Sequence, residues 1–313
     1  MDSGCTEFSL GLDWSSLFSV KIGLALPTID LAAGRTASLA ELGTRALAAE
    51  QLGFDSLWVM DHLWVERGGI RGGGHDPFVT LAYLAARTER VQLGTLVLCN
   101  SFRHPGQLAR ETAALSDASG GRFICGLGAG WHQPEYDAFG FPFDHKVSRL
   151  AETLEVIGPL LKGERVTHEG RFYQLREAST LVTAPAAPVW VAGGQPRMMD
   201  LIARHADGWN TAWLGGDPAP FSGKLLDLHA AIDKVGRPRD QVEISVGVFA
   251  LPEVGADSSD GKAITGGRTE VAEALNRYRE AGADHVIVSL SVLPFTEMNP
   301  AYPEALAEAI RLL

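Results

Sequence analysis

The stretch SLWVMDHLW (residues 56–64) begins with an apolar run of strand length and then changes to an aspartate and a histidine without a spacer. No charged residue interrupts residues 56–60. Such a run predicts a strand that is buried on both faces, as strands of a parallel sheet are. Asp61 and His62 then follow where this strand ends.

The same pattern recurs along the chain, because short apolar runs alternate with longer segments of helical spacing. This alternation is typical of parallel strands joined by crossover helices, and eight such units predict a closed (β/α)₈ TIM barrel, which needs about 250 residues. An open, doubly wound sheet is the alternative topology. The expected strands are residues 20–26, 56–60, 91–98, 122–128, 188–193, 208–212, 242–250 and 285–290.

Length and composition allow one large barrel or two domains, since 46% of the 313 residues are hydrophobic. We expect a loose leader over residues 1–18 and a single domain over residues 19–313. The net charge of −11 argues against a nucleic-acid or anionic membrane surface. Three scattered cysteines favour the reducing cytoplasm over a disulfide framework or zinc site, and no apolar stretch is long enough to span a membrane.

Two insertions interrupt the barrel pattern. Residues 66–77 hold five glycines and predict a mobile lid loop. Residues 163–188 contain two β-rich halves around Glu169 and Gly170, which predict a surface β-hairpin followed by a linker.

Active sites of parallel barrels lie at the carboxyl ends of the strands, which is where Asp61 and His62 are expected. An imidazole beside a carboxylate can act as a general acid or base. The alternative is structural, with Asp61 capping a turn and His62 filling the rim. The sequence has no serine-elbow motif and no HExxH motif, so neither triad hydrolysis nor a metal site is supported.

Two glycine-rich turns follow later strands. Gly126, Gly128 and Gly130 could let a flat ligand approach the backbone, although close packing of strand and helix explains such glycines equally well. Gly193, Gly194 and Gln195 precede a helix with Pro196 in its first turn. A helix entered through glycines can bind a phosphate through its free N–H groups, and an ordinary strand-to-helix turn is the alternative.

These residues together resemble the bacterial luciferase-like flavin and deazaflavin oxidoreductases, over nearly the whole chain after Val20. The segments FRHP and AFGFPFDHKVSRL are most similar to those of the branch that uses the deazaflavin coenzyme F420. Four segments carry the resemblance, in this order: LGFDSLWVMDHLW (52–64), LGTLVLCNSFRHP (93–105), LSDASGGRFICGLGAGWHQPEYDAFGFPFDHKVSRLAETLEVI (115–157) and VWVAGGQPRMMDLIARHADGWN (189–210).

The resemblance implies a barrel, commonly dimeric, with the cofactor ring in its mouth and the cofactor phosphate on the turn after strand five. It implies His62 as the proton-transferring residue, with Asp61 beside the ring, and a non-prolyl cis peptide at Leu96–Val97. The cofactor-binding residues that it implies are Asp61, Leu96, Val97, Cys99, Gly128, Ala129, Gly130, Gly193, Gly194 and Gln195.

One position departs from the resemblance. Some deazaflavin-dependent dehydrogenases carry a catalytic glutamate directly after the strand-four glycines, where this chain has Trp131. We expect Trp131 to line the substrate pocket by stacking. Glu135 is expected to begin a helix or to face solvent.

The two candidate cofactors imply different reactions. F420 implies hydride transfer to or from an alkene, imine or alcohol carbon of a small substrate, with His62 moving the proton. FMN implies a two-component monooxygenase, and a non-catalytic flavin-binding barrel is a third possibility. A homodimer, a separate reductase that supplies reduced cofactor, and lysine or arginine side chains at the rim are further expectations.

Overall fold

The computed structural model describes residues 20–182, 184–253, 255–256, 261–291 and 295–313. The expected leader, residues 1–18, lies outside the described residues. Within them, no helix is long and apolar enough to cross a membrane.

Eight parallel strands close into a barrel, as the alternating pattern predicts. The open sheet is excluded because the pairings form a complete ring, in which the first strand, β1, pairs with β4 and also with the last strand, β16. Each strand pairs in parallel with the next one around the ring. In ring order the strands are β1 (Lys21–Ala25), β4 (Ser56–Val59), β7 (Gln92–Thr95), β9 (Phe123–Gly128), β12 (Val189–Ala192), β13 (Gly208–Leu214), β14 (Glu243–Leu251) and β16 (His285–Ser289).

Two strands differ from their predicted extents by more than one residue at an end. The third ends at Thr95, and the chain resumes pairing with β9 only at β8 (Leu98–Cys99). Between them, the peptide bond joining Leu96 and Val97 is cis. The sixth strand runs past its predicted end to Leu214, with a register shift after Thr211.

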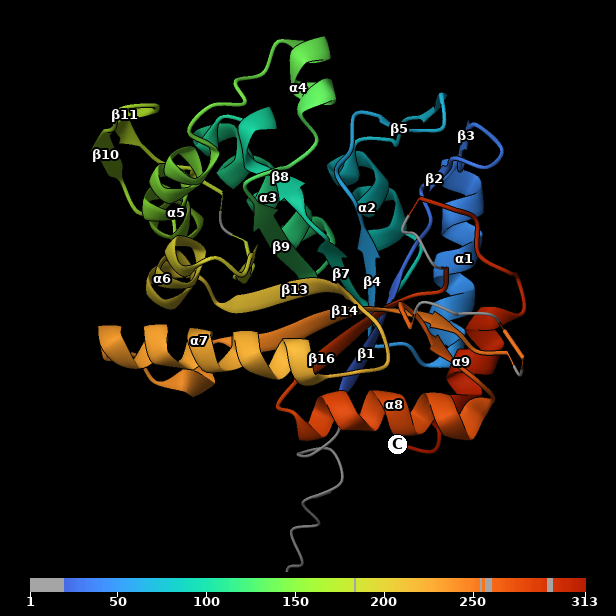
Figure 1. Ribbon diagram of the computed structural model, residues 1–313. Coiled ribbons are helices and arrows are strands. Elements are labelled where there is room, and N and C mark those ends of the chain that lie inside the picture. Colours follow the sequence, from blue (N-terminus) through green and yellow to red (C-terminus); the bar gives the residue numbers. More distant parts are fainter. Residues whose placement is uncertain (1–19, 183, 254, 257–260, 292–294) are drawn as a thin grey trace, which may run out of the picture.

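The helices lie outside the ring of strands (Figure 1). The first shows why they begin and end where they do. Ser38 and Glu41 form a reciprocal capping box at its start, and Gly53 ends it in the left-handed conformation. The helices are α1 (Leu39–Leu52), α2 (Pro77–Ala85), α3 (Pro105–Ala118), α4 (Gln133–Phe139), α5 (Lys146–Leu161), α6 (Pro196–His205), α7 (Ala219–Val235), α8 (Arg268–Glu280) and α9 (Tyr302–Ile310).

Short strands outside the ring add two-stranded antiparallel hairpins and one further parallel pairing to the barrel. The hairpin predicted within residues 163–188 is present as β10 (Val166–Glu169) and β11 (Gln174–Ala178). Another joins β2 (Ile29–Asp30) to β3 (Arg35–Thr36), and β15 (Ile264–Thr265) pairs in parallel with β14.

The glycine-rich segment 66–77 is not a plain loop, which corrects the expectation from its composition. It contains most of a hairpin of β5 (Val65–Arg67) and β6 (Ile70–Gly72). Gly68 and Gly69 form its two-residue turn with φ of 59° and 79°, and such turns favour glycine at both positions. The glycines therefore serve a turn here, and the role of the segment as a lid stays a prediction.

The amino-terminal end of the barrel is closed by a buried polar cluster under an aromatic layer. Ser56 Oγ lies 2.7 Å from both His285 Nε2 and Trp58 Nε1. The rings of Trp58 and Trp190 pack with centroids 5.2 Å apart. Burial lowers the pKa of His285, although Glu243, 3.6 Å from its Nδ1, opposes that effect. This end of the barrel is a packed floor, so the opposite end is where a ligand can enter.

Candidate active site

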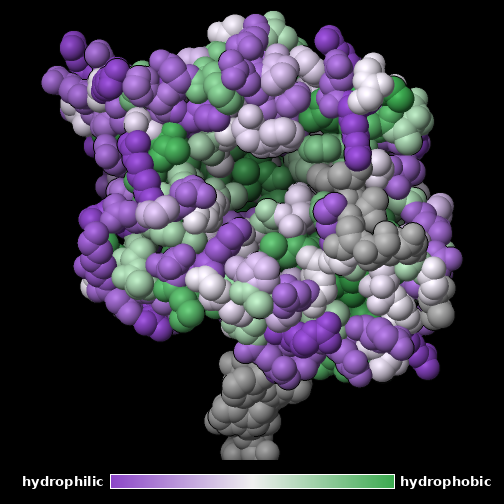
Figure 2. Space-filling model, viewed as in Figure 1, coloured by the Kyte–Doolittle hydropathy of each residue, from purple (hydrophilic) through white to green (hydrophobic). Residues whose placement is uncertain are grey.

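A cavity of about 510 Å³ lies at the carboxyl ends of the strands. Figure 2 shows a hollow near the middle of this face, with hydrophobic residues on its floor and hydrophilic ones around it. The residues expected to be catalytic, to bind the cofactor or to line the substrate pocket all line the cavity: Asp61, His62, Leu96, Val97, Cys99, Gly128, Ala129, Gly130, Trp131, Gly193, Gly194 and Gln195. Gly126, the first of the strand-four glycines, does not line it.

Asp61 does not contact His62, although the two are adjacent in sequence. Its carboxylate accepts hydrogen bonds from Arg103 Nη1 at 2.5 Å and from the Cys99 backbone N–H at 2.9 Å. Burial raises the pKa of the Asp61 carboxyl, and Arg103 opposes that rise. Asp61 therefore holds the cavity wall together through the segment that follows β7.

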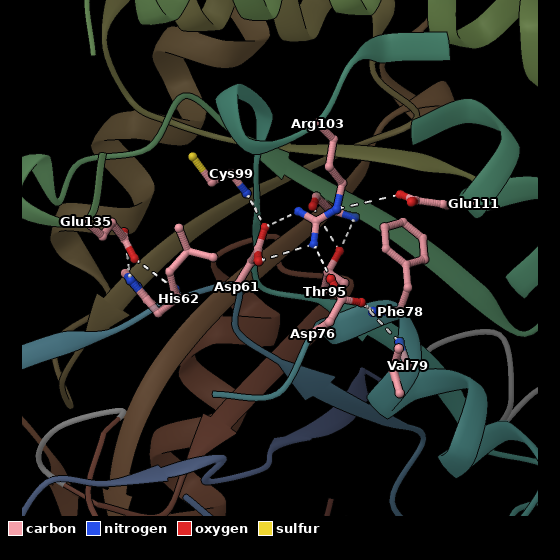
Figure 3. A network of polar contacts seen from close by, with 12 residues as sticks. Asp61, His62, Asp76, Phe78, Val79, Thr95, Cys99, Arg103, Glu111 and Glu135 are labelled. Carbon is pink, nitrogen blue, oxygen red and sulfur yellow. Dashed lines mark hydrogen bonds and ion pairs between the residues drawn. The ribbon is translucent and has the colours of Figure 1, made fainter. Parts of the chain in front are cut away.

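Arg103 is the centre of this polar network (Figure 3). Besides Asp61, it contacts Asp76 at 2.8 Å and Glu111 at 3.6 Å, and its side chain is only 11% exposed. Although burial lowers its pKa, Asp61 and Asp76 raise it above the ordinary value, so Arg103 stays charged. Three carboxylates surround this guanidinium, so it has little capacity left for a ligand.

The carboxylate that contacts His62 belongs to Glu135. His62 Nδ1 lies 3.1 Å from Glu135 Oε1, and Glu135 Oε2 accepts the Leu63 backbone N–H at 2.9 Å. Of the two placements expected for Glu135, the start of a helix is the one observed, because it lies in the first turn of α4; it is 2% exposed, so it does not face solvent. Two hydrogen bonds to the segment after β4 explain why a carboxylate is buried there.

This contact determines which ring nitrogen of His62 is available. With Nδ1–H donated to Glu135, Nε2 is the free nitrogen, and no residue of the described chain hydrogen-bonds it. A carboxylate hydrogen-bonded to one nitrogen of an imidazole fixes the tautomer and the orientation of the ring. His62 is thereby suited to accept or donate a proton at Nε2.

Aromatic side chains surround His62. Phe295 and Trp131 meet its ring edge-on, at centroid distances of 5.0 and 5.7 Å. Trp131 is largely exposed to solvent, with 63% of its surface accessible. This side of the cavity is an aromatic wall.

Close packing accounts for Gly128, the last residue of β9, and for Gly130 in the segment after it. A Cβ on Gly128 would lie 2.6 Å from Val97, and one on Gly130 would clash with the Tyr136 hydroxyl. Tyr136 also hydrogen-bonds Cys99 Sγ at 2.8 Å. Burial raises the pKa of the Cys99 thiol to about 12, so this cysteine is a protonated wall residue rather than a nucleophile.

The turn after strand five has the features of an anion site. Gln195 is the N-cap of α6 but makes no side-chain capping bond, so the first N–H groups of this helix keep their binding capacity. Lys224 of α7 lies beside the turn, since a Cβ on Gly194 would be 3.6 Å from its Nζ. Nζ also donates to Thr211 Oγ1 at 3.1 Å.

Lys224, Glu135 and Asn210 were not predicted from the sequence. Lys224 supplies the expected rim cation, but it lies 30 residues beyond the turn it adjoins. Asn210 lines the cavity and donates to Ser245, and its Oδ1 is buried without a hydrogen-bond partner. A buried free acceptor in a cavity wall suits an N–H donor of a ligand. In the described residues, no cluster of His, Cys, Asp or Glu could hold a metal ion.

Residues 20–260 match the model of the luciferase-like monooxygenase family. The chain belongs to this family. It is therefore an oxidoreductase, and the resemblance read from its motifs is confirmed.

Several curated relatives are named as F420-dependent glucose-6-phosphate dehydrogenases. An F420-dependent glucose-6-phosphate dehydrogenase of Microbacterium testaceum is 36% identical over 69% of this chain and 67% of its own length. A 5,10-methylenetetrahydromethanopterin reductase of Methanolobus tindarius is 30% identical over 69% of this chain and 62% of its own.

Solved structures agree in fold. An F420-dependent secondary alcohol dehydrogenase, in complex with an F420–acetone adduct, superimposes with a TM-score of 0.78 at 17% identity, covering 93% of this chain and 98% of its own. The F420-dependent tetrahydromethanopterin reductase of Methanopyrus kandleri gives 0.72 at 18% identity, covering 93% and 96%.

Proposed function

We propose that the protein is an F420-dependent oxidoreductase that transfers a hydride between the deazaflavin and a small organic substrate. The observation that carries this proposal is one cavity lined both by His62, which is hydrogen-bonded to the buried carboxylate of Glu135, and by the turn that precedes the uncapped amino terminus of α6. The F420-dependent relatives, at up to 40% identity, support the choice of cofactor.

The residues present fit such a cofactor. The α6 terminus with Gly193, Gly194 and Lys224 would hold its phosphate, because uncapped N–H groups and an ammonium both bind anions. Asn210 Oδ1 would accept a ring N–H. The apolar side chains of Leu96, Val97 and Met198 would line the site of the flat ring.

When bound, the deazaflavin supplies a two-electron hydride carrier that reacts poorly with oxygen. The protein's own part is proton transfer and positioning. His62 would exchange a proton at Nε2 with the substrate, while Glu135 keeps Nδ1 protonated and offsets the charge of the imidazolium. Phe295 and Trp131 would exclude water from this side of the cavity.

A flavin monooxygenase is the second candidate, because the family model describes luciferase-like monooxygenases. The same helix terminus would bind the phosphate of FMN. The alternatives differ in oxygen chemistry, since reduced FMN forms peroxides and the reduced deazaflavin does not.

Oxygen uptake separates them. Purified protein is supplied in air with reduced F420 or with reduced FMN, and oxygen and cofactor absorbance are followed together. We expect no oxygen uptake beyond that of each free cofactor, and a reduced F420 pool that a hydride acceptor then oxidises. Stimulated uptake with FMN, coupled to oxygenation of an added organic compound, would favour the monooxygenase.

A further inference from the structure

The charges that line the cavity point to a particular kind of substrate. Asp61 and Glu135 are two buried carboxylates, and Lys224 is the one lysine or arginine among the described residues that line it. The sequence has no lysine, arginine or histidine at the positions that the structure does not describe, which are 1–19, 183, 254, 257–260 and 292–294. They can add no cation to the site.

Lys224 belongs to the cofactor end of the cavity. It lies at Gly194 and donates to Thr211, on the strand that follows α6. A bound cofactor phosphate would use it. The substrate end is thus left without a lysine or arginine among its lining residues.

Three cations outside the cavity lining, Arg103, Arg71 and Lys146, have partners of their own. Arg103 is enclosed by carboxylates. Arg71 lies over the Trp64 ring at 4.5 Å and pairs with Glu66 at 2.5 Å. Lys146 Nζ lies 3.6 Å from the centroid of the Phe143 ring.

The wall that remains is aromatic. Trp131 and Phe295 flank His62, and Trp213 lines the cavity beyond them, stacked on Phe249 at a centroid distance of 5.2 Å. A mostly exposed tryptophan at a cavity mouth offers a flat surface that an apolar ring can cover.

A phosphorylated sugar fits this end poorly. A phosphate dianion would lose its hydration beside two carboxylates, with no arginine or lysine in the lining to compensate. An uncharged ring would instead cover Trp131 and leave each buried charge with its present partner.

We propose that the substrate is an uncharged molecule with an apolar ring that can lie on Trp131, such as an aryl ketone, its secondary alcohol or a cyclic enone, and not a sugar phosphate. This inference rests on the proposed function for the reaction, but its binding test does not depend on turnover. It separates this chain from relatives named as glucose-6-phosphate dehydrogenases.

Calorimetric titration tests it on protein saturated with oxidised F420. The ligands are acetophenone, 1-phenylethanol, 2-cyclohexen-1-one and glucose 6-phosphate. We expect at least one uncharged ligand to bind at least tenfold more tightly than glucose 6-phosphate. Tighter binding of glucose 6-phosphate, or no binding of any uncharged ligand, would overturn the inference.

Trp131→Ala is expected to weaken the uncharged ligand about tenfold and to leave the Kd of F420 unchanged. Phe139→Ala is the matched control, because Phe139 is an exposed aromatic residue of α4 outside the cavity lining. Equal ligand affinity in Trp131→Ala and wild type would contradict the proposed wall.

If F420 does not bind, the proposed function fails. The same titrations are then made without F420, in saturating inorganic phosphate to occupy the α6 terminus. Tighter binding of the uncharged ligands would still support the inference, and tighter binding of glucose 6-phosphate would still overturn it.

Discussion

At the residue scale, the neighbours Asp61 and His62 have separate partners and separate tasks. Asp61 binds Arg103, 42 residues away in sequence, and His62 binds Glu135, 73 residues away. The sequence alone predicted that Asp61 and His62 lie at the carboxyl end of the barrel, and the structure places them there. The sequence could not reveal that Glu135 supplies the carboxylate, because that contact depends on how α4 packs over the strand ends.

Glu135→Gln tests the positioning role. The amide keeps the shape but removes the negative charge behind His62, so kcat should fall roughly 10–100-fold while the Kd of F420 is unchanged. Asp137→Asn, at an exposed position of the same helix, is the control. An unaltered kcat in Glu135→Gln would remove Glu135 from the mechanism.

His62→Ala should lower kcat by about 10²–10⁴-fold with every substrate that is turned over, because proton transfer loses its carrier. Steady-state rates and F420 titration together make this measurement. Intact turnover in the variant would contradict the role assigned to His62.

Asp61→Asn should act on stability. It leaves Arg103 buried with one carboxylate fewer, which should lower the free energy of unfolding by roughly 3 kcal/mol. Denaturant unfolding of the variant and wild type measures this difference. A fully stable variant that has lost its activity would instead give Asp61 a direct part in the reaction.

At the element scale, the strands could be predicted because most of them are apolar runs buried on both faces, whereas the sixth, β13, contains Asn210 and Thr211 and is partly exposed at its end. What the pattern missed has local causes. The glycine-rich composition of residues 66–77 predicts a mobile loop, but Gly68 and Gly69 form a regular hairpin turn. The break after Thr95 is equally invisible, since residues 91–98 are continuously strand-like in sequence.

The α6 terminus carries the prediction at this scale. Gly194→Leu should obstruct the phosphate, and Lys224→Met should remove its cation, so each should weaken F420 binding at least tenfold. Fluorescence titration measures the Kd. Lys234→Met, on the exposed last turn of α7, should not change it. Unchanged affinity in both site variants would place the cofactor phosphate elsewhere.

At the scale of the whole molecule, the barrel has a closed floor and an open mouth, and the floor sets a pH limit. In the unfolded chain His285 takes up a proton as the pH falls below about 6.5. In the fold its pKa is lowered by burial against Trp58, Trp190 and Ser56, with Glu243 and Lys21 nearby, so it stays neutral longer. The unfolded state then binds more protons, and stability is lost as the pH falls through this range.

Urea unfolding at pH 7.5 and 5.5 measures this effect. The wild type should lose more stability between the two pH values than His285→Gln, which has no group that titrates at this position. An equal loss in both proteins would show that other groups govern the acid limit. The expected homodimer stays a prediction, and light scattering of the purified protein tests it.

The cofactor determines the reaction class, and one equilibrium measurement of cofactor affinity tests which cofactor the protein binds. Purified protein is titrated under nitrogen with oxidised F420 and, separately, with oxidised FMN, following cofactor fluorescence. We predict saturable binding of F420, at least tenfold tighter than FMN and weakened at least tenfold in Lys224→Met. Tighter binding of FMN, or an unchanged F420 affinity in Lys224→Met, would contradict the proposed cofactor and its phosphate site.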